Sequence, residues 1–149
     1  VTAGSFPLFR LIDEFNIPVN NVLGKMKSED FNCPGSLLQI YLDPTHPVAY
    51  GMADKAAAFV NERIAFQTTL PGPELSRKVL AWYPGDAEDI LLSGWIKGGE
   101  KLEHRAAAVA LTFGKGKIVL FGFRVQHRAQ TEGTFKLLFN ALHWGGFVE

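Results

Sequence analysis

The sequence has little of what disulfide-rich, membrane-spanning and nucleic-acid-binding proteins need. Its single cysteine, Cys33, excludes an internal disulfide and leaves the redox compartment undecided. No apolar run approaches the roughly 20 residues that span a bilayer. Fifteen basic residues balance fifteen acidic ones, so no excess charge favours nucleic acid or an anionic membrane. We therefore expect neither nucleic acid nor a membrane as a partner.

The N-terminus lacks an initiator methionine and the charged-then-apolar pattern of a signal peptide. We interpret it as a cut inside a longer chain. Internal repeats, low-complexity tracts and linkers are missing too. The 149 residues are enough to bury about two thirds of the unfolded surface. Residues 1–149 are therefore expected to form one compact α/β or α+β domain.

Several motifs of catalytic and metal-binding sites are absent as well. The four histidines, at positions 46, 104, 127 and 143, show neither His-Glu-x-x-His nor His-x-x-Glu spacing, so we expect no metal site in this chain. Ser93 lacks the flanking glycines of a Gly-x-Ser-x-Gly nucleophile turn. Residues 114–116, Gly-Lys-Gly, lack the spacing of a phosphate loop and fit a hairpin turn.

Cys33 leaves one catalytic alternative open. A cysteine nucleophile needs a neighbouring base or a positive field, and His46 or His127 could supply the base. However, the Asn-Cys-Pro-Gly setting is typical of a turn, and free cysteines are usually packing residues. The sequence therefore favours a structural Cys33.

Apolar patterning predicts strands in the middle of the chain and a helix at each end. Ser5, followed by Pro7, predicts the start of a helix that ends before Pro18. Strands are predicted at residues 36–42, 64–68 and 78–83, and in a hairpin formed by residues 106–113 and 117–123. Residues 56–60 fit a short strand or a helical turn equally well.

Apolar patterning in the last third of the chain predicts a buried strand followed by a helix. Residues 118–121 form an unbroken apolar run, which suits a strand covered on both faces. From Thr134 onward a helical period predicts a final helix that ends at Gly145 and Gly146. The side chains expected on its buried face are Phe135, Leu138, Phe139 and Leu142. Apolar surroundings predict core packing for the three tryptophans, Trp82, Trp95 and Trp144.

Between this strand and the final helix lies the densest cluster of hydrogen-bonding side chains in the chain. We call it the polar loop, and it consists of Arg124, Gln126, His127, Arg128 and Gln130. One interpretation is a ligand pocket at the carboxyl end of a sheet strand, beside a helix N-terminus that favours anions. The other is a structural loop, whose arginines pair with carboxylates or carbonyls and whose glutamines satisfy buried polar groups. The polar loop is the candidate binding site.

The same region carries a resemblance to a known family. Residues 114–131, Gly-Lys-Gly-Lys-Ile-Val-Leu-Phe-Gly-Phe-Arg-Val-Gln-His-Arg-Ala-Gln-Thr, and their continuation through residues 134–142 resemble the C-terminal region of large bacterial secreted proteins of the zinc carboxypeptidase (carboxypeptidase A-like) family. Residues 33–38, 46–52 and 92–95 are similar to other marks of that region. There, the region follows the peptidase domain and is similar to the class I glutamine amidotransferase-like fold, a flavodoxin-like α/β sheet.

The resemblance implies a mixed sheet with flanking helices and a secreted or periplasmic location. It implies the parent peptidase domain, or a second copy of the chain, as partner. Zinc is expected only in the parent peptidase domain, because no motif here matches that domain's zinc ligands or catalytic glutamate. An active amidotransferase would need a Gly-x-Cys-x-Gly turn and a later His-x-Glu pair, but Phe31 precedes Cys33 by two positions and Val48 follows His46 by two.

We therefore expect a non-catalytic accessory domain without a cofactor, formed by the C-terminal part of that fold. Two alternatives come from other functional classes. A binding module for peptide or glycan would use the polar loop, with Trp95 or Tyr50 as an aromatic anchor. A hydrolase would use Cys33 as its nucleophile.

Overall fold

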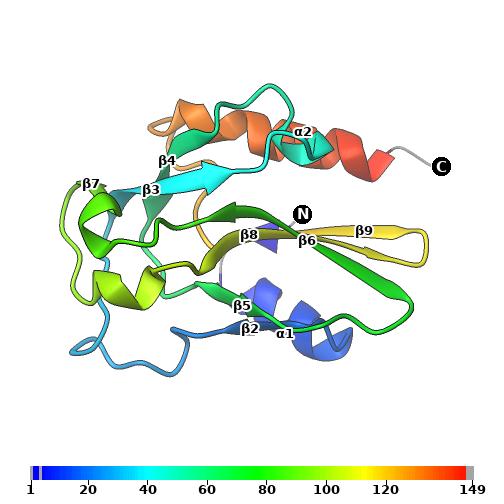
Figure 1. Cartoon of the computed structure of the whole chain (residues 1–149), viewed down its shortest axis with the longest axis horizontal. Coiled ribbons are helices and arrows are strands. Elements are labelled where there is room, and N and C mark those ends of the chain that lie inside the picture. The colour runs from blue at the N-terminus through cyan, green and yellow to red at the C-terminus, as the bar shows by residue number, and fades with distance from the viewer. Residues whose placement is uncertain (1, 4, 147–149) are drawn as a thin grey trace.

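The structure, a computed structural model, describes residues 2–3 and 5–146, and their side chains from residue 9 onward (Figure 1). The fold is mixed α/β, with one open, mainly antiparallel sheet and a C-terminal helix. The strands are β1 (Thr2–Ala3), β2 (Val19–Asn21), β3 (Ser36–Leu42), β4 (Lys55–Val60), β5 (Phe66–Thr68), β6 (Leu75–Trp82), β7 (Leu91–Ser93), β8 (Ala106–Phe113) and β9 (Gly116–Phe121). The α-helices are α1 (Ser5–Glu14) and α2 (Phe135–Gly146). Short 3₁₀ turns are η1 (Pro47–Ala49), η2 (Ala87–Asp89), η3 (Gly99–Leu102) and η4 (Glu132–Thr134).

The main path of the sheet runs in the order β1-β9-β8-β6-β3-β4. Strand β5 joins β2 to β8, and β7 pairs with β3. Among the described strands, β1 and β9 form the one parallel pair. Short connections such as the β8–β9 turn permit only antiparallel neighbours, because a parallel pair needs a long crossover. The expectation of a mixed sheet with flanking helices is confirmed.

Most of the predicted elements are present. Strand β3 has the predicted bounds, and the β8–β9 hairpin turns at residues 114–115 as expected. The undecided residues 56–60 belong to strand β4. Strand β5 begins only at Phe66, two residues later than predicted, whereas β6 begins at Leu75, three residues earlier. Neither described helix is both long and apolar enough to cross a bilayer.

Two clusters of buried side chains cover the two faces of the sheet. Val119 and Phe121 belong to the larger cluster, which also holds Leu137 of α2. Leu120 belongs to the smaller cluster, against which the apolar side of α1 packs. Figure 1 accordingly shows α2 and α1 on opposite sides of the sheet. Because side chains alternate along a strand, β9 is buried on both faces, which confirms the prediction from its unbroken apolar run.

The predicted buried face of α2 is wrong. Phe139 and Leu142 are 58% and 59% exposed, whereas Leu137 and Ala141 are buried. Polar anchors set the rotation of the helix. Just before α2, Thr134 donates its hydroxyl to Val125 O at 2.9 Å, and within it Asn140 donates to carbonyls of the η1 region. Because of these hydrogen bonds and the packing of α2 on η1, the face of α2 that is turned toward the sheet is not its most apolar face.

The tryptophans are less buried than predicted. Trp95 is 51% exposed, and Trp82 and Trp144 are partly buried. Trp95 follows the short strand β7, and its backbone is hydrogen-bonded to Ser36. Ser36 Oγ donates to Trp95 O at 2.6 Å and accepts from Trp95 N at 2.9 Å. The expectation of core packing is therefore wrong for Trp95.

Candidate functional site

The polar loop follows β9 directly and is anchored by buried side chains. Phe123 and Val125 are buried, while Arg124 and Gln126 between and after them are exposed. After β9 the backbone bends at Gly122 and Phe123, and the alternation of buried and exposed side chains begins at Phe123. The amide of Arg124 donates to Phe59 O at 3.0 Å, so this part of the loop lies against β4.

The Arg124 side chain links the polar loop to the connection between β4 and β5. Its Nε donates to Asn61 Oδ1 and its Nη2 donates to Glu62 Oε1, both at 2.8 Å. Both acceptors lie between β4 and β5. A guanidinium that donates to a carboxylate makes a stronger hydrogen bond than a neutral pair does. Arg124 therefore has the structural role that the second interpretation of the loop predicted for it.

His127 and the two residues after it shape the end of the loop. The His127 ring stacks on Phe59 of β4, with 4.3 Å between the ring centroids and 12° between the planes. Arg128 and Ala129 have φ angles of +49° and +56°, a left-handed conformation that is uncommon for residues other than glycine. Gln130 N donates to His127 O at 2.9 Å and closes the turn. The chain is thereby redirected from the sheet into η4 and α2.

The remaining side chains of the polar loop face solvent or a cleft. Gln126 and Arg128 are exposed and form no side-chain hydrogen bond or ion pair with any described residue. Gln130 lines a cleft of about 600 Å³ between β4 and the start of α2, which we call the β4 cleft. Neither arginine of the loop lines this cleft. The structure therefore does not bring Arg124, Arg128 and the glutamines together in one pocket.

The β4 cleft contains groups that the sequence analysis did not identify. Lys136 donates to Gly51 O at 2.9 Å, and Lys55 Nζ lies 5.2 Å from the centre of the Tyr41 ring. Thr131 is buried, and its Oγ1 has no hydrogen-bond partner among the described residues. No local pattern could have joined these residues, because Lys55 and Lys136 are 81 positions apart in the printed sequence. Only the packing of η4 beside β4 brings them together.

Cys33 lies in a setting that disfavours its reactive form. The side chain is 4% exposed, and Sγ donates to Val60 O at 3.2 Å. Burial raises the pKa of the Cys33 thiol, and hydrogen bonding with Ser36 offsets part of that rise. His127, one of the two bases considered for it, is stacked on Phe59. The thiol is therefore protonated at neutral pH, and the structural interpretation of Cys33 is favoured.

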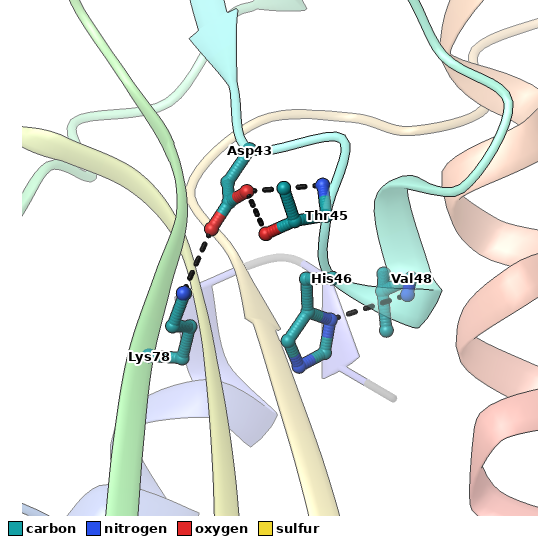
Figure 2. A network of polar contacts seen from close by, with 5 residues as sticks. All are labelled: Asp43, Thr45, His46, Val48 and Lys78. Carbon is teal, nitrogen blue, oxygen red and sulfur yellow. Dashed lines mark hydrogen bonds and ion pairs between the residues drawn. The ribbon is translucent and has the colours of Figure 1, made fainter.

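His46, the other candidate base, belongs to a polar network between β3 and η1 (Figure 2). Its Nδ1 accepts from Val48 N at 3.2 Å, and burial lowers its pKa. Nearby, Asp43 accepts from Thr45 N and from Lys78 Nζ, at 3.0 and 2.9 Å. The hydrogen bond from Thr45, followed by that from Lys78, lowers the pKa of Asp43 to about 2. Both groups stabilise this turn in their deprotonated forms.

The β4 cleft is lined by two ammonium groups, a carboxylate, an amide, a hydroxyl and strand backbone. Among the described residues, no three His, Cys, Asp or Glu side chains converge on a point that could hold a metal ion. No family model and no curated protein matches the chain. The resemblance to the zinc carboxypeptidase C-terminal region therefore stays a prediction.

Proposed function

We propose that the chain is a non-catalytic accessory domain of a secreted or periplasmic zinc carboxypeptidase-like protein, and that it acts through contacts with the peptidase domain or with a second copy of itself. The observation that carries the non-catalytic part is the setting of Cys33, whose thiol is buried and has a raised pKa. The use of Arg124 as a brace to Asn61 and Glu62 supports a structural role for the polar loop. Zinc would belong to the peptidase domain alone.

The finer fold assignment belongs to the same proposal. A class I glutamine amidotransferase-like, flavodoxin-like domain is built around parallel strands with helices between them. The parallel pair of β1 and β9, with α2 after β9, supports the assignment. The remaining pairs are antiparallel.

The complete open reading frame that encodes this chain provides the first test. We expect it to encode, on the N-terminal side, a peptidase domain with its own zinc ligands. When that domain and this chain are expressed separately and mixed, they should co-elute in size-exclusion chromatography. A reading frame without a peptidase domain would overturn the proposed parent, whereas separate elution would overturn the proposed contact.

Enzyme assays test the non-catalytic part separately. The chain alone should hydrolyse p-nitrophenyl acetate and glutamine no faster than its Cys33→Ser variant does. Turnover by the unmodified chain that the Cys33→Ser change abolishes would favour the hydrolase alternative instead.

The binding-module alternative has support in the exposure of its proposed anchors. Tyr50 is 76% exposed, and Trp95 is half exposed. Gln130 is the member of the polar loop that lines the β4 cleft. Since Arg124 and His127 are engaged with β4 and its following connection, a ligand would meet the cleft rather than the arginines.

A further inference from the structure

Strand β4 has a hydrogen-bonding edge that is only partly covered. It ends the main path of the sheet, and β3 is its strand neighbour (Figure 1). Leu42 N donates to Asp54 O at 2.8 Å, and the β3–β4 ladder continues in the same register. In an antiparallel ladder, hydrogen-bonded and non-hydrogen-bonded pairs alternate. Counting from this pair, the backbones of Ala56 and Ala58 are directed toward β3.

The residues between them are directed the other way. By the same alternation, the N–H and C=O groups of Lys55, Ala57 and Phe59 are directed away from β3. The bond from Arg124 N to Phe59 O agrees with this assignment, because it reaches β4 from outside the ladder. The polar loop thus covers the edge at Phe59. Lys55 and Ala57 present two donors and two acceptors in the spacing of a strand.

The β4 cleft lies along this uncovered part of the edge. Lys55, Ala56 and Ala57 line one wall. Residues 130–133 and Lys136 line the opposite wall. Its volume of about 600 Å³ falls in the range of about 300–1,000 Å³ that is usual for ligand pockets. Residues 130–133 and Lys136 occupy the space that the sheet of a second copy would need in order to pair with β4. The cleft therefore suits a single extended segment better than a second copy of the chain.

The charges around the cleft favour an acidic segment. Lys55 and Lys136 contribute two positive charges, and Glu132 is the acidic residue that lines the cleft. The N-terminal end of α2, which is positive, lies at the same wall. Thr131 lines the cleft, and its buried Oγ1 has no hydrogen-bond partner among the described residues. Leu37 and Met52 add apolar surface for alternate side chains.

We propose that the β4 cleft binds an acidic peptide segment in extended conformation, which adds to the sheet as a strand beside Lys55 and Ala57. Main-chain hydrogen bonds to an exposed edge give such complexes affinity, and side-chain pockets give them specificity. This inference rests on the proposed interaction role, but it does not require that the parent be a peptidase. It names an acidic peptide as the partner and the β4 cleft as its site.

The test uses a fluorescein-labelled acetylated hexapeptide of alternating valine and glutamate, titrated with the full chain and followed by fluorescence polarisation. We expect saturable binding. Replacing glutamate by lysine in the peptide should weaken it at least about tenfold, and N-methylation of alternate backbone amides should abolish it. N-methylation of the other set of alternate amides, which face away from β4, should be tolerated. Equal binding of the acidic and basic peptides, or binding that stays unchanged after N-methylation of each of the two sets in turn, would overturn the proposal.

Variants of the chain locate the site. Lys55→Glu combined with Lys136→Glu should weaken the acidic peptide at least about tenfold and improve the basic one. The paired control is Lys115→Glu combined with Lys97→Glu, which makes the same charge change outside the cleft. It should leave the ratio of the two affinities unchanged. Equal effects of the two double variants would overturn the assignment to the β4 cleft.

Ala57→Pro removes one outward N–H without touching the β3 ladder, a position where an edge strand tolerates proline. It should lower peptide affinity at least about fivefold with circular dichroism preserved. If this variant does not fold, the N-methylated peptides decide the same point. A dimer of the chain that the acidic peptide fails to dissociate would overturn the proposal in favour of a second copy. Peptide binding without peptidase contact would refute only the proposed contact with the peptidase domain, and the reverse result only this inference.

Discussion

Arg124 and Arg128 lie four positions apart in one loop, yet their surroundings differ completely. Arg124 forms an isolated β-bridge with Phe59, and its side chain reaches Asn61 and Glu62. Arg128 has a left-handed backbone and is directed into solvent without a polar partner among the described residues. One arginine therefore contributes to stability, whereas the other is exposed and lies outside the β4 cleft.

Replacing these arginines should separate the two roles. Arg124→Ala is expected to lower the free energy of unfolding by about 1 kcal/mol, because it removes two hydrogen bonds from a half-exposed side chain and leaves Glu62 unpaired. Arg128→Ala should change it by less than about 0.5 kcal/mol. Urea denaturation measures both values. Equal effects would mean that the brace to Asn61 and Glu62 does not stabilise the fold.

Cys33 should react slowly because it is buried and its pKa is raised. A raised pKa leaves less thiolate at neutral pH, and thiolate is the species that is alkylated. We expect iodoacetamide to modify the native chain at least about tenfold more slowly than the urea-unfolded chain, as measured by mass spectrometry. Alkylation of the native chain at or above the rate of a free thiol would contradict the structural role.

At the scale of elements, helix α2 shows how polar contacts determine orientation. Its most apolar stripe is partly exposed, because Thr134 and Asn140 bind carbonyl groups of neighbouring segments. A buried carbonyl without a partner costs about 1–3 kcal/mol. That penalty is comparable with the gain from burying one large apolar side chain. The helix therefore turns Leu137 and Ala141 inward.

Two alanine substitutions in α2 test this orientation. Leu137→Ala should lower the free energy of unfolding by about 3 kcal/mol, because the side chain is buried in the larger core cluster. Phe139→Ala should cost less than about 1 kcal/mol, because that ring is more than half exposed. Both values come from chemical denaturation. The opposite order of the two values would restore the face that the apolar periodicity predicted.

At the scale of the whole molecule, the turn after β3 couples stability to pH. The folded-state pKa values of both Asp43 and His46 are lowered, so the unfolded chain binds more protons than the folded chain in acid. The contribution of His46 is complete above its ordinary pKa of 6.5. It is lost as the pH falls below that value. The contribution of Asp43 is lost as the pH falls from 3.8 to about 2.

Melting temperatures should therefore fall in two steps on acidification, the first beginning near pH 6.5 and the second near pH 3.8. Differential scanning calorimetry across this range measures both steps. His46→Gln should remove most of the first step, and Asp43→Asn should reduce the second. A melting temperature that rises between pH 6.5 and pH 5 would contradict the lowered pKa of His46.

The sequence by itself determined the elements whose signals are local. Strand β3, the β8–β9 hairpin and the two helices are specified by apolar runs, turn formers and caps within a few residues. The burial of residues 119–121 on both faces also followed from their composition. In the candidate site, the sequence located the polar loop and allowed a structural role for its arginines.

The tertiary structure decided what depends on neighbours far away in the chain. Residues 56–60 form an edge strand because they pair with β3 on one side and have no strand neighbour on the other side in the main path of the sheet. Arg124 forms hydrogen bonds with Glu62 and Asn61, which lie 62 and 63 positions away in the sequence. The β4 cleft exists because η4 packs beside β4. Such contacts are set by the packing of whole elements, which no short window of sequence encodes.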